Sequence, residues 1–193
     1  MRFYFLIALV LTTLSVWGRV VTESQQVNYF LVDGVKYCLN SDLMSKGVSS
    51  KDGDQAVFIN GVNVVGSNIG KVKVFVDRND IGKNDPGRSA FEFIKSRGGP
   101  LEVVEATNDF VVYRSDEVAR KKEWIFKDLR DDEYFYYDCI FQLTCSINGT
   151  YEGEIGLRVD FNPGEKVLSN KEVLGVYRAI KQIVFGAFAN HQC

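Results

Sequence analysis

The spacing of apolar residues changes period once along this 193-residue chain, and this change constrains the fold more than any other feature. From about residue 27 to residue 161, short runs of β-branched and aromatic residues are separated by Gly, Asn and Asp, which is typical of antiparallel strands. From about residue 170 to residue 189, apolar residues recur every three or four positions, and a capping box formed by Ser169 and Glu172 precedes them. The sequence therefore predicts an α+β, β-rich fold. It is an antiparallel meander, curved or barrel-like, with a C-terminal amphipathic helix packed on it.

Turn residues place the first hairpins. The dipeptides Asp33-Gly34 and Asn60-Gly61 each lie between two β-type runs. Two-residue loops of this composition favour type I′ turns, in which both central residues have positive φ. We therefore predict one hairpin around each dipeptide. A later run alternates regularly and should bury one face, formed by Val72, Val74 and Val76.

The last hairpin is predicted from its register. Residues 135–145 and 151–161 both alternate apolar and polar positions, as two paired strands would. A three-residue loop over 147–149 places the apolar positions of both strands on one face. It also puts Gly149 where a type I turn with a G1 bulge needs a left-handed residue. We therefore predict a hairpin with Asn148 at its tip.

Four cysteines in an exported chain predict two disulfides. If residues 135–145 form one strand, Cys139 and Cys145 lie about 20 Å apart at 3.3 Å per residue. A disulfide needs Cα atoms within about 7 Å, so this pair is excluded on that reading. Each must then bind Cys38 or Cys193. Cys38–Cys145 with Cys139–Cys193 is mildly favoured, and the swapped pairing stays open.

The N-terminus and a glycosylation motif indicate export. Residues 1–18 combine a basic start, an apolar run and the small residues Val16 and Gly18 at positions −3 and −1 of a cleavage site, as in a secretory signal peptide. The run is shorter than the ~20 residues of a membrane span, so we expect no span after cleavage. Residues 19–193 are then predicted to form a single secreted domain. The sequon 148–150 predicts an N-glycan on Asn148, at the exposed hairpin tip.

The balance of charge excludes nucleic acid as a partner. The chain has 23 Lys+Arg and 25 Asp+Glu, a net charge of −2, with both signs interspersed. Such a chain has no extended positive field to hold a phosphate backbone. The basic cluster 120–122 is expected to be compensated by the acidic residues that follow it, within 128–133.

The sequence offers little catalytic equipment. His191 is the only histidine, which argues against Ser-His-Asp, Cys-His and multi-histidine metal sites. Glu152 and Glu154 lie about 7 Å apart on one strand face, a spacing suited to acid–base chemistry, but we expect them to be solvated. The Asp/Asn-rich segment 77–82 lacks ligands that a calcium loop needs. We therefore predict no enzyme activity, no cofactor and no metal.

An aromatic run completes the sequence prediction. Tyr134 and Tyr136 should point away from Phe135 and Tyr137, either as a second packing layer beneath the helix or as the lining of a ligand cavity or partner surface. The function that fits these features best is a secreted, disulfide-bonded glycoprotein that binds a small hydrophobic ligand or an extracellular protein. A small histidine-independent hydrolase that uses carboxylates is the alternative.

Overall fold

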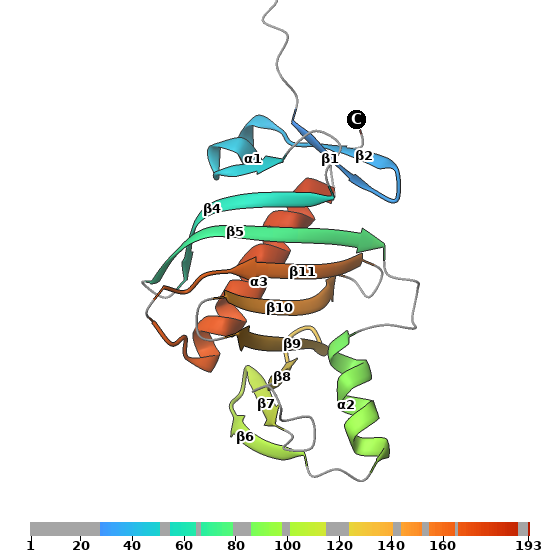
Figure 1. Cartoon of the computed structure of the whole chain (residues 1–193), viewed down its shortest axis with the longest axis vertical. Helices are drawn as coiled ribbons and strands as arrows, with labels where there is room; N and C mark the ends of the chain where they lie inside the picture. Colours follow the sequence, from blue (N-terminus) through green and yellow to red (C-terminus); the bar gives the residue numbers. More distant parts are fainter. Residues whose placement is uncertain are drawn as a thin grey trace, which may run out of the picture.

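The computed structural model describes residues 28–50, 55–64, 67–78, 86–97, 101–114, 124–140, 144–151, 155–164, 166–188 and 193 (Figure 1). The predicted signal peptide lies outside these residues. In chain order, the elements are β1 (Tyr29–Val32), β2 (Val35–Cys38), α1 (Ser41–Ser45), β3 (Val48–Ser50), β4 (Ala56–Val64), β5 (Ser67–Arg78), α2 (Pro86–Ser96), β6 (Glu102–Ala106), β7 (Phe110–Arg114), β8 (Trp124–Asp128), β9 (Glu133–Ile140), β10 (Thr144–Tyr151), β11 (Ile155–Phe161) and α3 (Asn170–Phe188).

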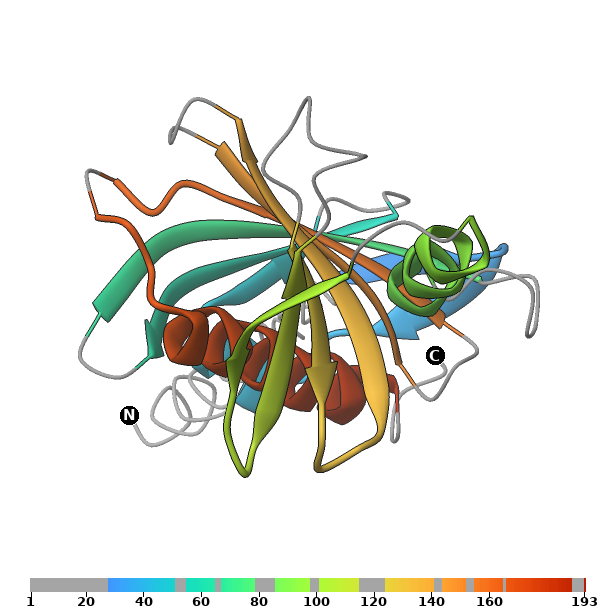
Figure 2. The ribbon, with the colours of Figure 1, turned by 90° about the horizontal axis from the view of Figure 1, so that it is seen from below.

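The strands form an open antiparallel sheet. Its order is β3-β4-β5-β11-β10-β9-β8-β7-β6, and β1 with β2 forms a separate two-stranded sheet. The chain first builds β3 to β5, crosses through α2 to the far edge, and returns strand by strand until β11 pairs with β5. The strands fan into a strong twist (Figure 2). The predicted β-rich meander with a C-terminal helix is confirmed, and it is a curved sheet rather than a barrel.

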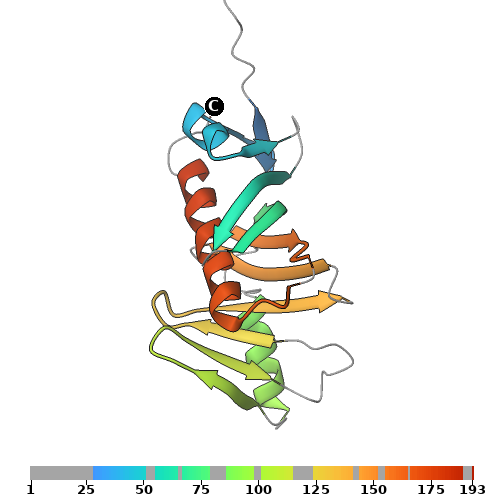
Figure 3. The same cartoon turned by 90° about the vertical axis from the view of Figure 1, so that its left-hand side faces the viewer.

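Two helices cover opposite faces of the sheet (Figure 3). Phe135 of β9 is buried and stacks on Tyr177 of α3, with ring centroids 4.2 Å apart. Its neighbour Tyr134 points the other way and lies 5.0 Å from the ring of Phe91 in α2. We call the α3 side the inner face and the α2 side the outer face. The predicted alternation in the aromatic run is therefore confirmed, but the second layer lies beneath α2 and not beneath the C-terminal helix.

The long helix α3 begins with the predicted capping box and fills the inner face. The Ser169 hydroxyl accepts a hydrogen bond from the Glu172 N–H (3.3 Å), and the Glu172 carboxylate accepts one from the Ser169 N–H (2.8 Å). Alternate residues of the central strands meet the helix and are fully buried, which removes apolar surface from water and stabilises the fold. The helix side of this core consists of Val173, Leu174, Val176, Tyr177, Ile180 and Val184.

The predicted last hairpin is wrong, because the chain reverses direction between Ile140 and Thr144. β9 pairs with β10 so that Cys139 lies directly opposite Cys145, and β10 continues through Asn148 in mid-strand. Residues directly opposite in this antiparallel pair have the same parity, so 135–145 shows the same alternation whether it is one strand or a hairpin. Without Gly, Asn, Asp or Pro at 141–143, no turn signal separated the two possibilities.

Both predicted disulfide pairings are therefore wrong as well. Cys139 bonds to Cys145, with Cα atoms 4.0 Å apart, and Cys38 bonds to Cys193, with Cα atoms 5.5 Å apart. The distance argument failed because it measured Cys139 to Cys145 along one strand, whereas the two residues face each other across two strands. The second bond links the β1–β2 hairpin to the end of the chain.

The two early dipeptides behave differently. Asp33 and Gly34 have φ of 49° and 78° and connect β1 to β2 as predicted. Asn60 and Gly61 instead lie inside β4, which pairs with β5 on both sides of them. Gly61 has a φ of 65°, so the dipeptide supplies a left-handed residue within a strand rather than at a turn.

Candidate binding face

The outer face carries a band of alternating rings and cations where β4, β5 and β11 meet. α2 contacts β8, β9 and β10, so it covers the other part of this face. On β4, β5 and β11 the residues between the buried valines, leucine and isoleucine point outward and are half-exposed or exposed. We call the following five residues the Phe–Lys band: Phe58, Lys71, Lys73, Phe75 and Arg158.

Strand register holds the band together. Phe58 lies opposite Lys73 across β4 and β5, and Phe75 lies opposite Arg158 across β5 and β11. The Lys73 Nζ is 5.5 Å from the Phe58 ring centroid and 4.2 Å from the Phe75 centroid. Lys71 Nζ lies 4.5 Å over Phe58, and Arg158 Cζ lies 5.6 Å over Phe75. Cation–π attraction therefore positions each charge over a ring without neutralising it.

The charges of the band are only partly compensated. Arg158 forms an ion pair with Asp160 at 3.1 Å, and Asp160 also accepts a hydrogen bond from the Ser146 hydroxyl at 2.8 Å. Among the described residues, no carboxylate lies within ion-pair distance of Lys71 or Lys73. The band is thus a local positive surface on a chain whose net charge is −2.

The sequon lies beside this band and not at a hairpin tip. Asn148 is half-exposed in β10 and pairs with Arg158 on one side and Tyr136 on the other. A Cβ on Gly149 would come within 2.6 Å of the Tyr177 hydroxyl, and Thr150 is only 1% exposed. A transferase needs access to the whole sequon, so attachment of the predicted glycan would have to precede the folding of β10. The glycan would then project over the outer face.

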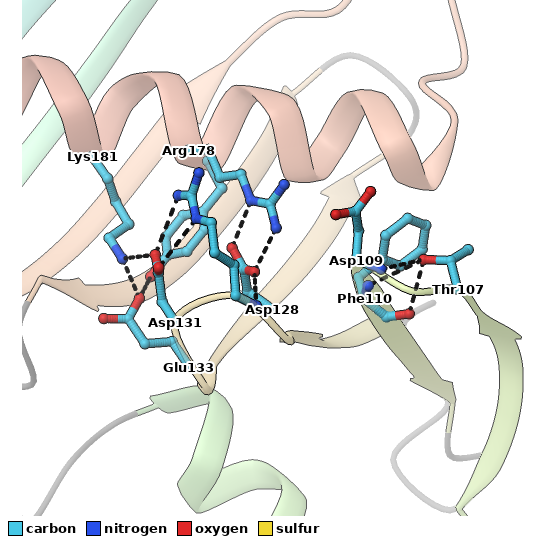
Figure 4. A network of polar contacts seen from close by, with 10 residues as sticks. Thr107, Asp109, Phe110, Asp128, Asp131, Glu133, Arg178 and Lys181 are labelled. Carbon is cyan, nitrogen blue, oxygen red and sulfur yellow. Dashed lines mark hydrogen bonds and ion pairs between the residues drawn. The ribbon is translucent and has the colours of Figure 1, made fainter.

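A second cluster of charges joins α3 to the turn between β8 and β9 (Figure 4). Arg178 donates two hydrogen bonds to Asp128, from Nε at 2.8 Å and from an Nη at 2.6 Å. The Asp128 side chain is fully buried and also accepts a hydrogen bond from the Arg130 N–H at 2.9 Å. The hydrogen bond that Arg178 donates to Asp128 raises the pKa of Arg178. This bidentate pair fastens the helix to the far side of the sheet.

The neighbouring turn of α3 contributes Lys181, which binds Asp131 at 3.1 Å and also Glu133. The hydrogen bond from Arg130, together with that from Lys181, lowers the pKa of Asp131. Burial raises the pKa of Glu133 and outweighs the opposing effect of Lys181. Two carboxyls whose pKa values move apart resemble an acid–base pair. Here Lys181 bridges both of them, so their arrangement is that of a structural contact. We call Arg178, Lys181, Asp128, Asp131 and Glu133 together the clamp.

This clamp predicts a pH dependence. Because the pKa of Glu133 in the folded protein lies above its ordinary value of 4.5, this group stabilises the fold below that pH and loses the contribution as pH rises through the folded pKa. The Glu133→Gln variant lacks this loss. We therefore expect the stability of the variant, relative to the unmodified protein, to increase from about pH 4 to about pH 7 in urea unfolding. If the free energies of unfolding of the two proteins change with pH in parallel, the raised pKa of Glu133 is contradicted.

Several residues singled out by sequence cannot be placed. Glu152, Glu154, His191, the basic cluster 120–122 and residues 79–82 lie outside the described residues. The expected compensation of that basic cluster stays a prediction; the described partners of the acidic residues in 128–133 include two cations of α3. In the described ranges, no group of three or more His, Cys, Asp or Glu side chains is arranged to hold a metal. No helix in those ranges is long and apolar enough to cross a membrane.

Sequence reasoning missed both the Phe–Lys band and the clamp. The residues of the band are single charges and rings on three different strands. The residues of the clamp lie on a helix and on a turn some 50 residues earlier in the chain. A partial signal exists for the clamp, since Arg178 and Lys181 are three residues apart and therefore share one side of α3. For the band, Lys71, Lys73 and Phe75 share one strand face by alternation, but their neighbours on β4 and β11 follow only from the register.

Comparison with known proteins adds information on the fold. No protein-family model matches the chain, and no curated protein matches it. Among solved structures, the chain is similar to the iron-regulated outer membrane lipoprotein FrpD of Neisseria meningitidis, with 10% sequence identity and a TM-score of 0.50. The match covers 86% of this chain and 94% of that one. At this identity the likeness shows that the two proteins share a fold, and the fold alone.

Proposed function

We propose that this chain is an exported binding protein whose partner is another protein, and that the partner docks on the outer face of the sheet at the Phe–Lys band. Two disulfides join its four cysteines, and such bonds persist in oxidising compartments outside the cytosol. Export also agrees with the signal peptide expected at residues 1–18. The single observation that carries the proposal is the Phe–Lys band, in which two half-exposed rings and three cations share one part of the outer face.

The packing of the inner face favours a protein over a small hydrophobic ligand. A carrier needs an apolar cavity of several hundred Å³, usually enclosed by a barrel or a cleft. Here the sheet is open, and α3 covers the side where the apolar residues of the strands converge. Tyr177 and Phe135 are both fully buried there, with their rings stacked on each other. The space that a carrier would use for its ligand is taken by the core.

The outer face carries two kinds of residue that are typical of binding surfaces. Protein interfaces are enriched in aromatic residues and arginine and depleted in lysine, so Phe58, Phe75 and Arg158 fit this composition, whereas Lys71 and Lys73 contribute charge. The Phe–Lys band supplies two rings and three cations on adjacent strands, and a sheet holds them in fixed positions. Asp131 and Glu133 of the clamp, by contrast, both bind Lys181. They therefore offer little support for the alternative, a hydrolase that uses carboxylates.

Selection of binders from a random peptide library displayed on phage tests this proposal. We expect the enriched peptides to lose binding to Phe58→Ala and Phe75→Ala variants and to keep binding to Val103→Ala and Val104→Ala variants. The two valines are the matched control because they are exposed on the edge strand β6, away from the band. Thermal unfolding of each variant separates loss of the surface from loss of the fold. Binders that ignore the phenylalanine substitutions would contradict the proposed site.

Native mass spectrometry of the exported protein provides an independent test. The proposal expects a mass that equals the chain from residue 19 to residue 193, with two disulfides and any glycan on Asn148. A retained small apolar molecule would contradict it and favour a carrier. The mass also reports whether Asn148 is modified, and an Asn148→Gln variant gives the matched unglycosylated reference.

A further inference from the structure

We infer that the occupant of the Phe–Lys band is an extended acidic segment of the protein partner, with carboxylates at two alternate positions and an apolar residue at the next alternate position. This inference rests on the proposed function and adds the chemistry of the partner. It follows from three properties of the band: its charge, its spacing along β5, and the position of its rings.

The excess of positive charge in the band selects the sign of the partner. Lys71 and Lys73 have no carboxylate of the described residues within ion-pair distance, and their ammonium groups lie over phenylalanine rings. Asp160 lies directly opposite Lys73 across β5 and β11, but its carboxylate binds Arg158 and the Ser146 hydroxyl. Among the described residues, the three cations of the band therefore outnumber the carboxylate beside them. Asp138 lies three strands from Lys73, roughly 14 Å at the usual strand spacing, which exceeds the screening length at physiological salt. A partner therefore gains by bringing its own carboxylates to the band.

Spacing along β5 selects the form of the partner. Lys71, Lys73 and Phe75 are alternate residues of one strand, so they follow each other at roughly 6.6 Å on one face. Alternate side chains of another extended segment have the same spacing and also point to one side. A segment laid along β5 can therefore place a carboxylate over each lysine and an apolar side chain over Phe75. A helix would need its carboxylates three or four residues apart to present them on one side, so alternate carboxylates are specific to an extended segment.

The position of the rings argues against a lipid surface as the occupant. Basic residues beside aromatic ones also bind anionic membranes, where the aromatic rings insert among the lipids. Phe58 and Phe75 are half-buried in the sheet surface, and cations lie over both rings. Insertion among lipids requires rings that project beyond the charges, and these rings lie beneath them.

Fluorescence anisotropy with defined probes tests this inference. The probe is a labelled peptide with the core Glu-Ser-Glu-Ser-Phe, and the controls carry Gln-Ser-Gln-Ser-Phe or Glu-Glu-Ser-Ser-Phe. We expect the alternating acidic probe to bind most tightly, and a Lys71→Gln or Lys73→Gln variant to weaken it about two- to fivefold each. The preference should shrink at high salt. Lys171→Gln, at an exposed position of α3, is the matched control and should leave binding unchanged.

The outcomes separate this inference from the function on which it rests. Equal binding of the acidic and amide probes, with both lost in Phe58→Ala and Phe75→Ala variants, would overturn the acidic occupant and leave the docking face intact. If neither the phenylalanine nor the lysine substitutions matter, the proposed function fails as well. Phosphatidylserine vesicles that bind, and lose binding in the lysine variants while the acidic peptide does not bind, would overturn the inference in favour of a membrane.

Discussion

Replacing Cys38 and Cys193 together by serine should lower the free energy of unfolding by about 5 kcal/mol, because their disulfide joins residues 155 positions apart. In the chain-entropy model, a crosslink restricts the unfolded chain more strongly when it closes a longer loop. The bond between Cys139 and Cys145 spans only 6 positions, so the same model gives about 2 kcal/mol for its removal. Urea unfolding of the two double variants, compared with the oxidised protein, measures both losses.

The comparison also tests the connectivity. Each double variant should retain its other disulfide, so peptide mapping of the Cys38→Ser/Cys193→Ser protein should recover a peptide that contains linked Cys139 and Cys145. A crosslink between Cys38 and Cys145 in the unmodified protein would contradict the structure. Equal losses of stability in the two variants would contradict the loop-length argument while leaving the pairing in place.

Breaking the buried ion pair should have a comparable effect. In an Arg178→Met variant, the helix keeps a long aliphatic side chain, but the Asp128 carboxylate loses both charge-assisted hydrogen bonds. Since the Asp128 side chain is fully buried, its charge is left without compensation, and we expect a loss of about 3–5 kcal/mol in the free energy of unfolding. Urea unfolding followed by circular dichroism gives the value.

Two further variants make this result specific. Lys171→Met, at an exposed position of the same helix, should change stability by no more than about 0.5 kcal/mol. The double variant Asp128→Leu/Arg178→Met should recover part of the loss, because it removes the uncompensated charge, although the hydrogen bond to the Arg130 N–H is also lost. A cost below about 1 kcal/mol for Arg178→Met would show that the pair behaves like an exposed one.

The clamp and the disulfides have a shared structural role. Arg178 and Lys181 attach one side of α3 to the turn between β8 and β9, and the bond to Cys193 ties the end of the chain back to the β1–β2 hairpin. The helix is thus attached to the β8–β9 turn, and Cys193 is attached to the separate β1–β2 sheet. The inner face is covered by α3, and the docking surface that we propose lies on the part of the outer face formed by β4, β5 and β11.

Part of this architecture follows from local sequence signals. The capping box, with Ser169 and Glu172 three residues apart, places the start of α3 because its hydrogen bonds form between near neighbours. Alternation of Val72, Val74 and Val76 fixes which side of β5 is buried, since neighbouring side chains of a strand point to opposite faces. Asp33 and Gly34 tolerate positive φ and therefore mark a turn.

Strand pairing does not follow in the same way. Alternation over residues 135–145 is identical for one strand and for a tight hairpin, so it assigns a face to each residue without assigning a neighbour. Asn60 and Gly61 show the converse error, because positive φ at Gly61 is compatible with a turn and also with a distorted strand interior. The wrong disulfide pairing and the wrong place of Asn148 both follow from the first ambiguity.

The sequence by itself determined the β-rich class, the faces of the strands and the closing helix, because each depends on residues a few positions apart. Only the tertiary structure decided the sheet order, the partners of the four cysteines, the clamp and the Phe–Lys band. The band, for example, depends on the long-range contact between β5 and β11, which brings Phe75 opposite Arg158 although they are far apart in sequence. The candidate binding surface belongs to this second group, because no single strand contains it.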